Sequence, residues 1–134
     1  MVKIIDRLIQ KWTEESIGFN LGPCSSSENN LLNDVATRNL PAGIRSLLCH
    51  INGMDEDTEY DLLGYRFYPT SEVYNIDKSD YFVFADYLHA SYVFAEGPSG
   101  IYMIFSGIEN ARLLSDSMES FLELYLTNSK HLDL

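Results

Sequence analysis

The second half of the chain contains a succession of short segments that favours an antiparallel sheet over alternating βαβ units. Aromatic and β-branched residues, which are typical of strands, are concentrated in residues 65–68, 81–85, 91–95 and 101–105. Residues 97–100, Gly-Pro-Ser-Gly, join the last two runs and are too few for a crossover helix. We therefore expect this pair to be antiparallel. Residues 111–114 are a candidate for one more short strand.

Helical periodicity dominates the first part of the chain. One apolar face in residues 1–12 is made by Ile4, Ile5, Leu8, Ile9 and Trp12, which predicts an amphipathic helix. A capping box of Ser25 and Glu28 predicts a second helix over residues 25–38.

Two further helices are predicted from similar signals. Pro41 suits the first turn of a third helix, Asn52-Gly53 suits its end, and its apolar face comprises Ile44, Leu47, Leu48 and Ile51. Asp116 and Glu119 form a second capping arrangement before a closing helix whose apolar face comprises Met118, Phe121, Leu122 and Tyr125.

This order of elements predicts an α+β fold. We expect a single domain over residues 1–134, with a mainly antiparallel sheet of about five to six strands, N-terminal helices and one C-terminal helix. The 134 residues fall in the range of one domain, and 46% of them are hydrophobic, so one core is expected to form without a metal or a disulfide scaffold.

Acidic residues outnumber basic ones and give a formal net charge of −11. Nine acidic and only two basic residues lie between Met54 and Asp86. This charge disfavours nucleic acid and anionic lipid as ligands, and it favours the approach of a basic protein. The charge is explained equally well by a requirement for solubility, without any basic partner.

The acidic residues at alternate positions from Asp55 to Asp61 have the spacing of a calcium loop. Calcium binding is nevertheless disfavoured, because Tyr60 stands where the loop needs glycine and Arg66 where it needs a bidentate carboxylate. The segment is then either a solvated loop or a patch that faces a partner.

Cysteine and histidine give no catalytic or metal-binding pattern. Cys24 and Cys49 lack zinc spacing and are expected to be inert thiols, and His50, His89 and His131 lie far apart in sequence. We expect no cofactor, no metal and no enzymatic activity. The N-terminal segment has no uninterrupted apolar region for secretion, and no run in the chain is long enough to span a membrane. Two cysteines are too few for a disulfide scaffold, so a reducing cytoplasm is the expected location.

The order and spacing of these segments over about residues 25–126 resemble the SUKH superfamily of Smi/Knr-type domains. The resemblance rests on the helix from Ser25, the Leu40-Pro41 helix start and residues 65–73, Tyr-Arg-Phe-Tyr-Pro-Thr-Ser-Glu-Val. It continues with residues 82–88, Phe-Val-Phe-Ala-Asp-Tyr-Leu, and with residues 120–126, Ser-Phe-Leu-Glu-Leu-Tyr-Leu. The chain departs from the family after Asp86, where Tyr-Leu-His-Ala-Ser replaces the usual Gly/Asp-rich turn.

The resemblance implies a single domain with an antiparallel sheet and helices, and neither catalytic residues nor a cofactor. It implies an immunity protein that neutralises a polymorphic toxin, often a basic nuclease or deaminase, by direct binding. A scaffold or regulator like the family's fungal regulator of cell-wall synthesis is the alternative. An unrecognised enzyme would instead present a pocket of convergent polar groups with shifted pKa values.

The acidic segment and the end of the central strand are the predicted partner-binding sites. The residues are Asp55, Glu56, Asp57, Glu59, Asp61, Asp86, Tyr87 and His89. The competing interpretation is that the first five belong to a solvated loop and that Asp86 caps a turn.

Overall fold

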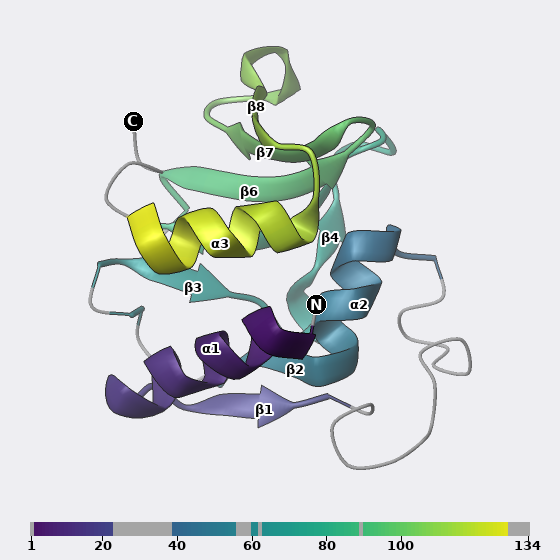
Figure 1. Ribbon diagram of the computed structural model, residues 1–134. Helices are drawn as coiled ribbons and strands as arrows, with labels where there is room; N and C mark the ends of the chain where they lie inside the picture. Colours follow the sequence, from purple (N-terminus) through teal and green to yellow (C-terminus); the bar gives the residue numbers. More distant parts are fainter. Residues whose placement is uncertain (1, 23–38, 56–59, 62, 89, 129–134) are drawn as a thin grey trace.

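The predicted α+β architecture is present in the computed structural model (Figure 1), which describes residues 2–22, 39–55, 60–61, 63–88 and 90–128. The predicted helix over residues 25–38 lies outside the described residues.

An antiparallel six-stranded sheet forms the centre of the fold. Along it the strands run in the order β3-β5-β6-β7-β8, and β4 pairs with the other end of β5. The strands are β3 (Tyr65–Phe67), β4 (Tyr74–Asn75), β5 (Phe82–Tyr87), β6 (Tyr92–Gly97), β7 (Gly100–Ile104) and β8 (Arg112–Ser115). The four predicted runs match β3, β5, β6 and β7, and the additional short strand is β8. Gly97 pairs with Gly100 across the predicted antiparallel turn.

A separate two-stranded sheet pairs β1 (Phe19–Leu21) with β2 (Ile51–Met54). The sequence did not indicate either strand, and the prediction that Asn52-Gly53 ends a helix is wrong. Helix α2 (Ala42–His50) ends earlier and continues directly into β2. Gly53 has a φ of 69°, and a Cβ there would stand 2.2 Å from the backbone nitrogen of Pro69. The glycine therefore permits the close approach of β2 to the chain after β3.

Two helices from opposite ends of the chain pack together on one face of the main sheet. Figure 1 shows α3 (Met118–Asn128) crossing this face with α1 (Val2–Glu14) beside it. Phe121 of α3 lies between the rings of Phe84 and Phe94, with centroid distances of 5.5 and 5.4 Å. The side chains of Val83 and Ala95 belong to a smaller cluster with Tyr68 and Ile104. The alternation of the strands therefore supplies two apolar clusters.

The two helix starts differ from the sequence prediction in how they are capped. Ser117, not Asp116, caps α3, because its Oγ accepts a hydrogen bond of 3.1 Å from the backbone N–H of Ser120. At α2 the carboxylate of Glu96, from β6, accepts hydrogen bonds from the N–H groups of Gly43 and Ile44 at 3.1 and 2.7 Å. A strand residue thus supplies the acceptor that this helix lacks locally.

Candidate functional site: a tyrosine-lined cleft around Asp86

An open cleft of about 520 Å³ lies at the β3, β4 and β5 part of the sheet. Its lining residues are Tyr60, Arg66, Tyr68, Glu72, Tyr74 and Asp86. Arg66 and Asp86 face each other in register on β3 and β5. Strand alternation places Arg66 and Tyr68 on the face opposite to the buried Phe67. The cleft therefore combines three aromatic rings, two carboxylates and one guanidinium.

Asp86 is the most buried charged residue of the cleft, with 4% of its surface exposed. Its Oδ2 accepts a hydrogen bond of 2.7 Å from the Tyr68 hydroxyl. The hydroxyl of Tyr60 interacts with the carboxylate too, but Oδ1 accepts no hydrogen bond of normal geometry from the described residues. A buried carboxylate oxygen without a donor is energetically costly, and a donor that reached this atom would lower that cost.

Arg66 does not neutralise Asp86 through a direct ion pair within the described residues. Its guanidinium donates two hydrogen bonds to Glu72, of 2.5 and 3.0 Å, and lies over the ring of Tyr68 at 5.6 Å. The hydrogen bond with Glu72 is the largest cause that raises the pKa of Arg66. Because Arg66 and Glu72 compensate each other, the charge of Asp86 dominates the cleft.

The tyrosine hydroxyls of the cleft remain protonated at neutral pH. Burial is the largest cause that raises the pKa values of Tyr60, Tyr68 and Tyr74, and the negative charge of Asp86 raises all three further. The three side chains therefore offer neutral hydroxyls and aromatic faces. Aromatic faces attract cations, and a nearby carboxylate strengthens that preference.

The structure describes four of the eight predicted partner-binding residues. Glu56, Asp57, Glu59 and His89 lie outside the described residues. Asp55 is half-buried, and its backbone N–H donates to the carbonyl of Gly18 at 3.0 Å. Tyr87 is half-buried against the ring of Tyr65, at a centroid distance of 4.6 Å. Among the four predicted residues that the structure describes, Asp86 alone lines the cleft.

Asp61 corrects the sequence interpretation of the acidic segment. Both explanations considered for it, a solvated loop and a partner-facing patch, require exposure, but only 5% of Asp61 is exposed. Its Oδ1 accepts hydrogen bonds from the backbone N–H groups of Leu63 and Tyr65 at 2.9 and 3.0 Å, and its Oδ2 accepts one from Tyr125. The carboxylate therefore organises the turn before β3 and links it to α3.

Five cleft residues were not singled out by the sequence: Tyr60, Arg66, Tyr68, Glu72 and Tyr74. The alternation of residues 65–68 was a usable signal, since it separates Tyr65 and Phe67 from Arg66 and Tyr68. It could not indicate which polar side chains of other strands would meet Arg66.

Cys49 is not the free thiol that the sequence suggested. It is buried on α2 and disulfide-bonded, whereas Cys24 lies outside the described residues. Disulfides are more typical of oxidising compartments than of the cytosol, so this bond weakens the argument for a cytoplasm based on cysteine usage.

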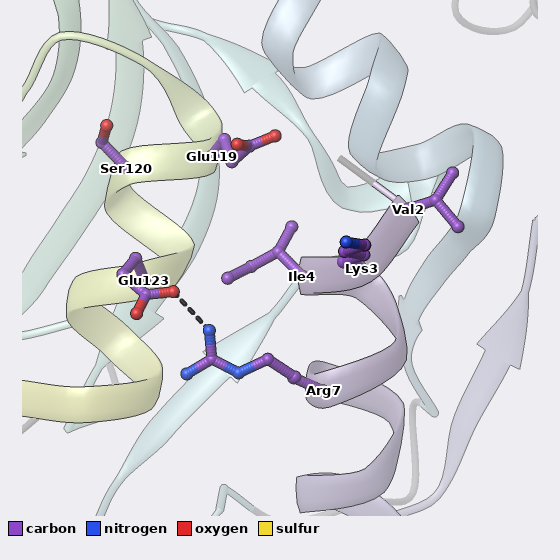
Figure 2. Close-up of a pocket in the computed structure, with 7 residues that line it drawn as sticks. All are labelled: Val2, Lys3, Ile4, Arg7, Glu119, Ser120 and Glu123. Atoms are coloured by element: carbon purple, nitrogen blue, oxygen red, sulfur yellow. Dashed lines mark hydrogen bonds and ion pairs between the residues drawn. The ribbon is translucent and has the colours of Figure 1, made fainter.

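A second hollow, of about 660 Å³, lies between α1 and α3. Figure 2 shows Arg7 of α1 reaching Glu123 of α3 across it, with Nη1 and Oε2 2.5 Å apart. About half of each side chain is exposed, so solvent screens this ion pair. Ile4 contributes an apolar wall but is itself part of the core.

No protein-family model, curated protein or solved structure matches this chain. In the described part of the chain, no helix is long and apolar enough to cross a membrane. The same residues contain no group of three or more His, Cys, Asp or Glu side chains placed to hold a metal ion.

Proposed function

We propose that this chain is a non-catalytic protein-binding domain that docks a basic partner at the face carrying the Asp86 cleft. The observation that supports the proposal is that an open cleft lies in the same segment of the chain as most of the negative charge. All six cleft residues come from residues 60–86, which belong to the segment with nine acidic and two basic residues. The cleft thus lies within the most acidic part of the sequence.

Electrostatic attraction supports a basic protein as the partner. A net charge of −11 accelerates the approach of a cationic surface and opposes nucleic acid or anionic lipid. Exposed rings at the cleft, such as Tyr74 with 47% exposure, supply contact area that salt screens less.

Within this class, the role we propose is that of an immunity protein that neutralises a cognate toxin. This part rests on the resemblance of residues 25–126 to the SUKH superfamily, whose bacterial members bind polymorphic toxins that are often basic. A cytoplasmic location belongs to the same proposal. The basic character of such toxins agrees with the acidic cleft.

Affinity capture followed by a growth assay tests the proposal. The tagged chain is incubated with extract of its own organism, washed at moderate salt, and the retained proteins are identified by mass spectrometry. We expect one stoichiometric basic protein that stops growth when expressed alone and is harmless when co-expressed with this chain. Several substoichiometric signalling or envelope proteins would instead favour a scaffold, and a stoichiometric partner without toxicity would contradict the immunity role.

A further inference from the structure

We propose that the cleft is a receptor for one basic side chain of the partner, with Oδ1 of Asp86 as the anchor for its charged N–H group. The inference rests on the proposed function and adds to it the chemical group that the site selects. It starts from Asp86, whose Oδ1 is buried and accepts no hydrogen bond of normal geometry from the described residues.

The charges of the cleft select a cation over an anion. Asp86 and Glu72 are acidic, and Arg66 is held by Glu72 through two hydrogen bonds. A single negative charge therefore remains, and it belongs to Asp86. A charged N–H donor at Oδ1 would satisfy a buried acceptor and compensate this charge in one contact.

The walls of the cleft suit the same cation. Tyr60, Tyr68 and Tyr74 line it, and Arg66 already lies over the ring of Tyr68 at 5.6 Å. Because this contact shows that a tyrosine ring of the cleft accepts a cation on its face, a second cation that enters beside Asp86 can use the exposed ring of Tyr74. An anionic or apolar side chain would leave Oδ1 without a donor.

A protein side chain, rather than a free small cation, fits the openness of the site. The cleft is open to solvent on a face where Tyr74 is 47% exposed, so a bound residue keeps its backbone outside. The net charge of −11 then attracts the rest of a basic surface.

Titration with capped tripeptides, followed by NMR of the backbone amides, tests the inference. The probes are acetyl-Gly-Lys-Gly-amide and acetyl-Gly-Arg-Gly-amide, with acetyl-Gly-Gln-Gly-amide as the neutral control. We expect saturable shifts at residues 66, 68 and 86 with dissociation constants of about 1–10 mM for at least one cationic peptide. The neutral peptide is expected to cause no saturable shift.

Two variants and a matched control locate the binding. Asp86→Asn keeps the size of the side chain and an acceptor for Tyr68, so its spectrum should remain that of a folded protein, and it should bind the peptide at least about tenfold more weakly. Tyr74→Ala should weaken binding about two- to fivefold through loss of one ring. Asp116→Asn removes an equal charge at an exposed position outside the cleft and should bind like the wild type.

Equal binding by the wild type and Asp86→Asn, or equal binding of the neutral peptide, would overturn the inference. n-Butylammonium binding tenfold more tightly than either peptide would overturn the choice of a protein side chain. The proposed function fails separately. If the affinity column retains no partner but the peptide titrations are positive, the cation site stands and the protein-binding function fails. If the Asp86→Asn column retains the partner as well as the wild type does, the protein-binding function stands and the role of Asp86 as the anchor fails.

Discussion

Tyr125 connects three parts of the chain through one hydroxyl group. It donates a hydrogen bond to Asp61, accepts one of 3.1 Å from the indole nitrogen of Trp12, and is fully buried. Burial is the largest cause that raises its pKa, so the hydroxyl remains protonated. Because Trp12 is on α1 and Asp61 precedes β3, this group positions both against α3. Buried polar groups that satisfy one another in this way specify a single packing arrangement.

Tyr125→Phe is expected to lower the free energy of unfolding by about 1–3 kcal/mol, because Trp12 and Asp61 each lose a buried partner. Urea denaturation measures the change. Tyr102→Phe, which removes a hydroxyl at a half-buried position, is the matched control and should cost less. Equal losses in the two variants would contradict the account of the hydrogen-bonded network.

Glu96 makes the stability of α2 depend on pH. Burial is the larger effect on its carboxyl group and raises the pKa above the ordinary value of 4.5, and the hydrogen bonds from Ile44 and Gly43 oppose the shift only in part. A raised pKa in the folded state means that protons favour folding. The contribution is fully present below the ordinary pKa and is lost as the pH rises through the folded-state pKa.

Unfolding experiments on the wild type and Glu96→Gln between about pH 3 and pH 8 test this sign. The unfolding free energy of the wild type minus that of Glu96→Gln should fall as the pH rises through the titration of Glu96, and it should then become constant. A difference that increases with pH would show that the hydrogen bonds outweigh the burial.

At the scale of helices and strands, periodicity predicted the elements whose side chains alternate between core and solvent. The apolar positions of α1, including Leu8 and Trp12, are buried, and so are Phe84 and Phe94 of the central strands. The elements that were missed are short. β1 and β4 span three and two residues, and two of the three residues of β1 are exposed, so neither is long enough for an alternating pattern to be recognised.

The missed strand β2 has another physical cause. Its sequence, Ile-Asn-Gly-Met, contains a helix-ending signal, but the backbone becomes extended at Ile51, where φ is −134°. Pairing with β1 overrides the local preference. The predicted cap of α3 was wrong by one residue. Asp116 and Ser117 are both good capping residues, and only the geometry of the folded chain distinguishes them.

Ser117→Ala is expected to destabilise the protein by about 0.5–2 kcal/mol, because the N–H of Ser120 loses its acceptor. Asp116→Ala, at the position that the sequence favoured, should cause a smaller loss. Thermal unfolding of the two variants compares them directly, and a larger loss in Asp116→Ala would contradict the assignment of the cap.

At the scale of the whole molecule, the sequence indicated the acidic character of the site but not its shape. Asp86 was predicted because it lies at the end of the central strand, yet its position opposite Arg66 depends on strand register. Register is set by pairing partners far apart in sequence, and one residue of slip would turn Asp86 to the other face. The burial of Asp61 likewise depends on Tyr125, 64 residues away.

The net charge predicts a salt-sensitive association. Raising the ionic strength from about 0.02 to 0.5 M should slow association with the captured partner at least about tenfold and change its dissociation less. Stopped-flow or surface-based kinetics measure both rates.

Asp77→Asn combined with Asp80→Asn, at two exposed positions of the acidic segment, should slow association, whereas Glu109→Gln outside it should slow association less. An association rate independent of salt would exclude electrostatic steering.

The most direct test of a basic partner docked at the cleft is parallel affinity capture on the wild type, Asp86→Asn and Asp116→Asn, with quantitative mass spectrometry of the retained proteins. The account predicts one basic protein, retained stoichiometrically by the wild type and Asp116→Asn and strongly reduced on Asp86→Asn. Retention of only acidic proteins, or the same set of proteins on all three columns and on a blank column, would contradict it.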